Sequence, residues 1–120
     1  QPWWAPPAWV FAPVWMVLYI IIAITFGTVF YKAFTGAIPL FVALPFALNI
    51  VFNFAYTWFQ FGLKNNYLAS VDVILVVLTL KWAMGAIYLY LPWVALANIP
   101  YLIWVAFAVV LQLTVTYLNK

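Results

Sequence analysis

Long apolar stretches separated by short polar or proline-containing turns run along the whole chain. Four of them have the length of a helix, over residues 9–31, 38–61, 68–91 and 97–118. About 20 helical residues cross the roughly 30 Å of hydrocarbon in a bilayer, so each stretch is long enough to span a membrane. The pattern therefore predicts an all-α integral membrane bundle, with four transmembrane helices in a single domain over residues 1–120.

The second stretch carries polar side chains that a purely lipid-facing helix does not need. At about 100° per residue they share one narrow face, while the other faces are large and apolar. These positions are Asn49, Asn53, Tyr56 and Gln60. Because polar groups are costly against lipid tails, the stripe must face other protein or a ligand. We interpret it as the floor of a pocket, and hydrogen bonds between helices from Asn49 and Asn53 are a compatible alternative.

Aromatic side chains recur at helical spacing in the first and last stretches. In the first, one face holds Trp15, Tyr19, Ile22 and Phe26. In the last, one side holds Tyr101, Trp104, Ala108 and Gln112. A small alanine between an indole and a polar tip leaves room for a flat apolar ligand with a few polar atoms. Packing between helices explains the same spacing, and both interpretations stay open.

The third stretch contains the single acid, Asp72, and a lysine well inside the span, Lys81. Nine positions separate them, which is about 180° around a helix, so they cannot pair with each other. Asp72 is close enough to the start of its helix for us to expect contact with interfacial water or a capping role on a neighbouring helix. For Lys81, one interpretation is that its long stem carries the amine to the headgroups, and the other is contact with a partner subunit or an anionic lipid.

Composition excludes most soluble and enzymatic classes. The chain has 72% hydrophobic residues, four lysines, one acid and a net charge of +3, which is too little charge to cover a soluble domain. The lysines are scattered, so we expect no nucleic-acid partner. Without Cys or His, disulfides, thiolate chemistry, Ser-His-Asp triads and ordinary zinc or haem ligation are excluded. We expect no metal site and no covalent cofactor.

Four spans place both chain ends on one side of the membrane, together with the turn at Lys64. Lys64 and Lys120 lie on that side and Lys32 on the other, so we place both ends in the cytoplasm, in a bacterial inner membrane or an organellar membrane. Residues 1–13 hold four prolines and three tryptophans. We interpret this segment as an interfacial lead-in, and the alternative is that it covers a ligand.

Several segments, in order and spacing, resemble a known family. They are PWWAPPAWVFAPVW (residues 2–15), FNFAYTWFQFG (52–62), LASVD (68–72) and PYLIWVAFAVVLQ (100–112). Together they resemble the translocator protein family, also called tryptophan-rich sensory protein or TspO/MBR, over nearly the whole chain. The resemblance implies a five-helix membrane protein, often dimeric, that binds porphyrins and in some cases sterols or synthetic ligands. Some bacterial members are implicated in light-dependent porphyrin breakdown.

The resemblance also assigns residues by position: pocket tryptophans at Trp15 and Trp104, the asparagine of the family's polar helix at Asn53, a neighbouring aromatic at Tyr56 and an acid at Asp72. The chain departs from the family where Phe54 and Tyr56 replace a tryptophan that usually follows the asparagine. It departs again where Gln112 replaces an asparagine near the end of the last helix. The four stretches match family helices two to five, so we expect that a further segment or a partner helix covers the flank of the pocket, or that the groove is open.

Three functional hypotheses follow. The preferred one is a membrane protein that binds a porphyrin, another tetrapyrrole or a similar flat apolar ligand inside the bundle, for sensing, transport or regulation. Its expected ligand-binding residues are Trp15, Tyr19, Asn49, Asn53, Tyr56, Trp104 and Ala108. The second is a light-dependent porphyrin-degrading enzyme in which Trp15 and Trp104 are redox-active. The third is an accessory subunit of a larger membrane complex. Membrane lipids and either a second copy or such a complex are the expected partners.

Overall fold

The computed structural model describes residues 8–118, apart from the side chains of Ala8, Gln60 and Phe61. Its elements are α1 (Ala8–Phe34), α2 (Leu40–Thr57), the π-helical turn η1 (Trp58–Gly62), α3 (Asn66–Tyr88), α4 (Pro92–Ala97) and α5 (Ile99–Leu118). The described part of the chain is helical, and four of its helices are long and apolar enough to cross a bilayer. The predicted all-α membrane bundle is therefore confirmed. Residues 1–7 of the proline- and tryptophan-rich lead-in, the Gln60 side chain and Lys120 lie outside the described residues. Residues 8–13 of that segment form the start of α1, with Pro13 inside the helix.

Local chemistry explains where several of these helices begin and end. After α1 the chain turns at Gly36, whose φ of 83° is a left-handed conformation that glycine adopts without steric cost. Pro39 directly precedes α2, with an extended backbone. The side chain of Asn65 caps α3, because its Oδ1 accepts a hydrogen bond of 3.0 Å from the backbone N–H of Leu68.

The helix boundaries differ from the sequence prediction by a few residues, and beside two of them the structure adds a short helical element. The second span is α-helical only to Thr57, and η1 then completes it through wider hydrogen bonds such as Leu63 N–H to Trp58 O at 2.9 Å. The third span ends at Tyr88 rather than residue 91, and the short helix α4 precedes α5. Pro92 begins α4, where its missing N–H leaves no hydrogen bond unmade.

The junction between α4 and α5 is tied to α1 through Asn98. Its Nδ2 donates to Val94 O at 2.9 Å and to the Thr25 hydroxyl at 3.0 Å. Asn98 is fully buried. A break in a membrane helix frees backbone groups that need new partners, and this asparagine supplies some of them.

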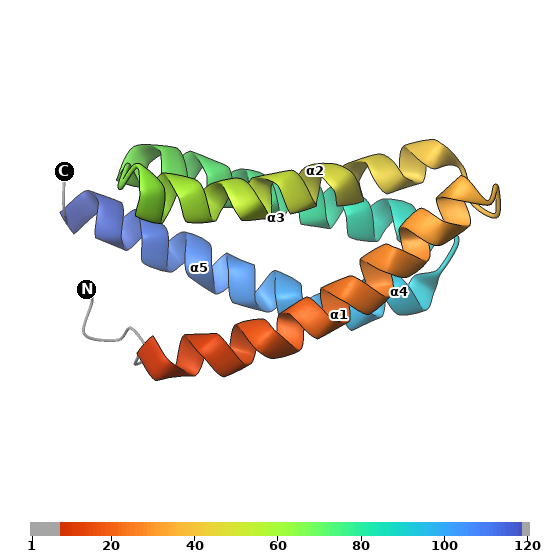
Figure 1. The fold of residues 1–120 in the computed structure, drawn as a ribbon, viewed down its shortest axis with the longest axis horizontal. Coiled ribbons are helices and arrows are strands. Elements are labelled where there is room, and N and C mark those ends of the chain that lie inside the picture. The colour runs from red at the N-terminus through yellow and green to blue at the C-terminus, as the bar shows by residue number, and fades with distance from the viewer. Residues whose placement is uncertain (1–7, 119–120) are drawn as a thin grey trace.

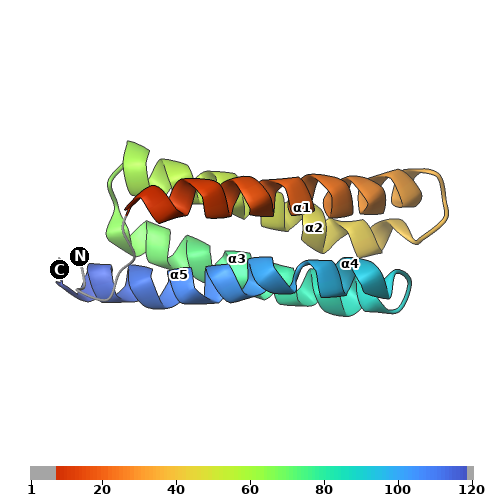
Figure 2. The same cartoon turned by 90° about the horizontal axis from the view of Figure 1, so that it is seen from below.

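Helix α3 is the centre of the bundle, since it packs against α2, α4 and α5 (Figures 1 and 2). The described core includes Phe26, Phe46, Leu80 and Tyr101. Phe26 and Phe46 meet edge to face, with ring centroids 4.8 Å apart, and this contact joins α1 to α2. The start of α1, the turn after η1 and the end of α5 lie at the same end of the bundle, as four spans require.

Helix α1 is the least enclosed of the long helices. Only 17% of its most apolar window is buried inside the structure, compared with 44% for α3. In Figure 1 it lies close to α2 and α4 near its C-terminal end and diverges from α2 toward its start.

Candidate functional site

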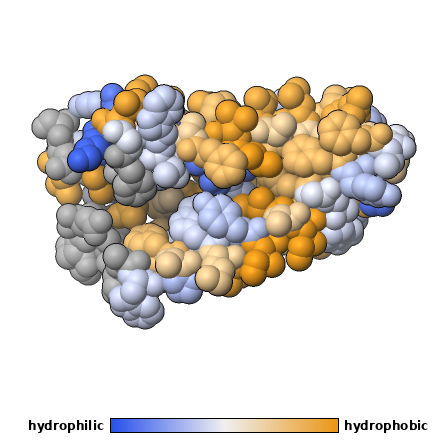
Figure 3. All heavy atoms as spheres, viewed as in Figure 1, coloured by the Kyte–Doolittle hydropathy of each residue, from blue (hydrophilic) through white to orange (hydrophobic). Residues whose placement is uncertain are grey.

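A cavity of about 620 Å³ lies among α1, α2, α3 and α5. Figure 3 shows the molecule hollowed between α1 and α2, within a face that is otherwise mostly apolar. The residues that line the cavity are Phe11, Trp15, Tyr19, Asn53, Tyr56, Thr57, Val73, Val76, Trp104, Val105, Ala108, Leu111, Gln112 and Val115. Most of this lining is apolar, with a few polar groups concentrated on α2 and α5.

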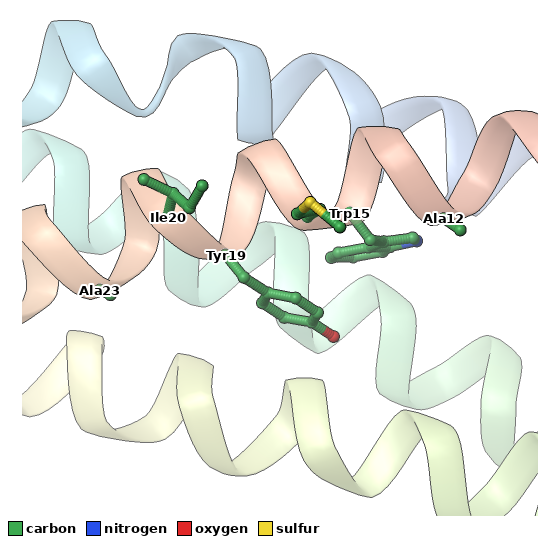
Figure 4. Close-up of a pocket in the computed structure, with 6 residues that line it drawn as sticks. Ala12, Trp15, Tyr19, Ile20 and Ala23 are labelled. Carbon is green, nitrogen blue, oxygen red and sulfur yellow. The ribbon is translucent and has the colours of Figure 1, made fainter.

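One side of the cavity, which we call the aromatic wall, consists of Phe11, Trp15 and Trp104. The rings of Phe11 and Trp104 meet edge to face with centroids 5.4 Å apart, so α1 and α5 touch across this wall. Trp15 packs against Tyr19 at 5.3 Å. Figure 4 shows Trp15 and Tyr19 side by side on α1, with the Tyr19 ring extending toward α2. The wall presents large flat surfaces on which another ring system can stack.

The polar part of the lining, which we call the polar wall, consists of Asn53, Tyr56 and Gln112. From Asn53 a hydrogen-bond chain runs into the protein: its Nδ2 donates to the Tyr101 hydroxyl at 2.8 Å, and that hydroxyl donates to Asn49 Oδ1 at 2.8 Å. Asn49 Nδ2 then donates to Val76 O at 2.9 Å and to Thr79 Oγ1 at 3.1 Å. This chain links α2, α5 and α3 in the interior of the bundle.

A second chain begins at Tyr56. Its hydroxyl donates to Gln112 Oε1 at 2.7 Å, and Gln112 Nε2 donates to Thr116 Oγ1 at 3.3 Å. Thr116 and Ser70 share a hydrogen bond of 2.7 Å, and both hydroxyls reach the backbone carbonyl of Asn66, at 3.2 and 2.8 Å. The polar wall is thus held in place by two networks that both end on α3.

The two charged side chains of α3 lie in different environments. Asp72 is only 3% exposed, and its Oδ2 has no hydrogen-bond partner among the described residues. The expectation that it contacts interfacial water was therefore wrong, because the side chain is buried inside the bundle. Lys81 is exposed on the outside of the bundle, as expected for a side chain that points away from Asp72.

The structure brings six of the seven predicted ligand-binding residues to one cavity: Trp15, Tyr19, Asn53, Tyr56, Trp104 and Ala108. The seventh, Asn49, does not line the cavity. It is 1% exposed and hydrogen-bonded to α3 and α5. Asn49 therefore makes the hydrogen bonds between helices that were the alternative interpretation of the polar stripe. Whether any of these residues binds a ligand stays a prediction.

The sequence prediction did not include α3 or Phe11 in the lining of the cavity. Val73 and Val76 line the cavity, but a valine in an apolar helix carries no signal that separates it from ordinary packing. Gln112 was noted as a polar side chain on the last helix, but it was not among the expected ligand-binding residues. In the described part of the chain, no group of metal-ligating side chains comes together.

The outer side of α1 carries a second, shallow apolar surface. It is lined by Ala12, Trp15, Met16, Tyr19, Ile20 and Ala23, all from this one helix (Figure 4). A single helix cannot enclose a small ligand, so we assign the candidate site to the cavity inside the bundle.

Comparison with known proteins agrees with this architecture. A family model described as the TspO/MBR family matches residues 1–118. The "Tryptophan-rich protein TspO" of Bacillus cereus is 37% identical over 79 residues, which cover 66% of this chain and 50% of that protein. A protein of the same name from Archaeoglobus fulgidus is 31% identical over 90 residues, covering 75% of this chain and 56% of the relative.

An "Uncharacterized membrane protein YtaB" of Bacillus subtilis is 33% identical over 81 residues, covering 66% of this chain and 50% of the relative. The chain thus spans about half the length of the curated relatives it matches. The family match extends over almost every residue of the chain, including both walls of the cavity. This protein is a multi-pass integral membrane protein and belongs to the TspO/MBR family.

Proposed function

We propose that the protein binds a flat, mostly apolar ligand of the tetrapyrrole class in the cavity among α1, α2, α3 and α5, for sensing, transport or regulation. The observation that carries the proposal is that both walls line one cavity. The aromatic wall offers stacking surfaces, and the polar wall offers hydrogen-bonding groups that are already held in place by the protein. Pre-positioned polar groups lose little freedom when a ligand binds.

The dimensions and chemistry of the cavity support this class of ligand. A volume of about 620 Å³ falls within the roughly 300–1,000 Å³ that is typical of small-molecule sites. The lining is mostly apolar, which suits a hydrophobic ring system that enters from the membrane. Trp15 and Trp104 come from different helices and both reach the cavity, so a flat ligand can contact both.

We also propose that another helix, from a second copy or from a larger membrane complex, covers the opening between α1 and α2. Asn53 and Tyr56 line the cavity, and an open flank brings them within reach of lipid tails. The relatives named above come from two bacteria and an archaeon, which supports a prokaryotic cell membrane rather than an organellar one.

Titration with protoporphyrin tests the proposal. Replacing Trp104 or Trp15 by alanine removes a stacking surface, so we expect the affinity to fall by about tenfold in each variant. The measurement is quenching of porphyrin fluorescence by the full chain in lipid nanodiscs. Trp82→Ala is a matched control, since Trp82 is half exposed on α3 and does not line the cavity. An unchanged affinity in both Trp104→Ala and Trp15→Ala refutes the proposal.

A further inference from the structure

The outer surface of the bundle carries positive charge without an exposed acid to balance it. Lys64 and Lys81 are exposed, the first in the turn after η1 and the second on the outer side of α3. The sequence contains one acidic side chain, Asp72, and it is 3% exposed. Neither this chain nor a second copy of it can therefore offer an exposed side-chain carboxylate to Lys81. The counter-charge has to come from another kind of molecule.

The position of Lys81 along α3 places it below the headgroups of one leaflet. Helix α3 ends at Tyr88, and Tyr88, Tyr90 and Trp93 are all exposed. Tyrosine and tryptophan gather where a membrane meets water, so these three residues mark the headgroup level at this end of the bundle. Lys81 precedes Tyr88 by two helical turns, which is about 10 Å along the helix. Because a charge that stays at such a depth is costly, the amine has to reach the headgroups.

Gly85 leaves a path for this side chain. The Cα–Cβ bonds of an α-helix tilt toward its N-terminus, whereas the nearest headgroups lie beyond the C-terminal end of α3. The stem of Lys81 therefore has to fold back over the next helical turn. Gly85 is exposed at that turn, and a Cβ added there would meet open space. Tyr88 follows on the same face and is 56% exposed, so the amine can lie beside its hydroxyl.

We propose that Lys81, Gly85 and Tyr88 form a site for the phosphate of an anionic phospholipid on the outside of α3. The amine supplies an ion pair, the tyrosine hydroxyl donates a hydrogen bond, and the missing side chain at Gly85 makes room for both. The acyl chains lie against Leu78 and Ile74, which continue the same exposed face away from these headgroups. None of these residues lines the cavity, so the site does not depend on the proposed function.

Charge decides which occupant fits this face. The phosphate of phosphatidylcholine already has the choline cation beside it, while the phosphate of phosphatidylglycerol has no cation of its own. A lysine near the membrane surface therefore favours the anionic lipid. A second copy of the chain is a poorer occupant, because a two-fold contact uses the same patch on both copies and would bring two Lys81 side chains into one interface.

Quenching by brominated lipids tests the site. Trp82, next to Lys81, is 50% exposed on α3 and responds to lipids at this face. The full chain is reconstituted in phosphatidylcholine vesicles that contain a fixed fraction of either phosphatidylglycerol or phosphatidylcholine with brominated acyl chains. Subtracting the signal of Trp82→Phe, measured in the same vesicles, isolates the quenching of Trp82. The ratio of quenching by the two lipids measures the local preference for the anionic one.

We expect brominated phosphatidylglycerol to associate about fivefold more strongly than brominated phosphatidylcholine beside Trp82. Lys81→Met should remove this preference, Lys81→Arg should retain it because arginine keeps the charge, and Tyr88→Phe should weaken it. Lys64→Met is the matched control. It also removes an exposed lysine, but Lys64 lies just before the start of α3, at the opposite end of the bundle, so the preference should stay as in the unmodified chain.

Three results would overturn the proposal. Equal quenching by the two lipids would show that the face does not select an anionic headgroup. A preference that survives Lys81→Met would arise elsewhere on the chain. A preference that disappears when inorganic phosphate is added at constant ionic strength would belong to a site for free phosphate rather than for a lipid.

Discussion

At the scale of single residues, Asn49 and Asn53 show how position decides the role of identical side chains. They lie one helical turn apart on α2 and belong to the same hydrogen-bond chain. Asn49 is 1% exposed and uses both of its amide hydrogens and its oxygen within the protein. Asn53 lines the cavity and makes one hydrogen bond, from its Nδ2 to the Tyr101 hydroxyl, within the described residues. The first is a structural residue, and the second is a candidate binding residue.

This difference predicts unequal effects on stability. Asn49→Ala leaves the buried hydroxyl hydrogen of Tyr101 without its acceptor and removes the bonds from α2 to Val76 O and Thr79 Oγ1, so it should lower the free energy of unfolding by about 1–3 kcal/mol. Asn53→Ala removes one bond at the cavity and should cost less. Thermal unfolding of the purified chain in detergent measures both. A larger loss for Asn53→Ala than for Asn49→Ala would contradict this assignment.

The cavity-lining residues that could be predicted from the sequence are those whose side chains are unusual in an apolar helix. The other lining residues were not predicted. Trp15, Trp104, Asn53 and Tyr56 stand out because large aromatic or amide groups recur at helical spacing in an otherwise aliphatic chain. Helical spacing alone could not separate Asn49 from Asn53, because the two share a face and differ only in depth along the helix. That depth depends on where Tyr101 and Val76 pack, which no local pattern contains.

At the scale of elements, the lengths of the apolar stretches were sufficient to predict four spans, since bilayer thickness sets a minimum helix length. The short elements were not predicted. A π-helical turn arises when backbone hydrogen bonds shift by one residue, and residue preferences for that shift are weak. The α4 helix follows from Pro92 at its first position and from Asn98 at its end. From the sequence, these residues were predicted only to belong to a loop between two spans.

Two glycines provide a test of the packing at η1. A methyl group added at Gly62 would lie against the indole of Trp58, so Gly62→Ala should displace that ring from its stack on Phe59 and destabilise the protein by about 1 kcal/mol. Gly85, inside α3, has open space around it, and Gly85→Ala should stabilise the helix by up to about 1 kcal/mol. Detergent unfolding compares the two variants, and equal shifts for both would show that η1 is not packed as described.

At the scale of the whole molecule, the exposed side of α1 and the opening beside it predict contact with another membrane helix. A photo-crosslinker at Met16, which is 64% exposed on the outer surface of α1, should therefore capture a protein in native membranes. A crosslinker at Lys81 examines the outside of α3 separately. If both positions capture only lipid, and the chain binds its ligand as a monomer, no partner covers α1 and Lys81 reaches the headgroups on its own stem.

The direction of the two hydrogen-bond chains also bears on the energetics of transport. A proton relay needs groups that accept a proton on one side and release another on the far side. Both chains instead end on backbone carbonyls, of Val76 and Asn66, which have no proton to release. The amide side chains within each chain cannot turn over without breaking these bonds. Among the described residues, these two chains therefore do not by themselves form a continuous proton path across the bundle.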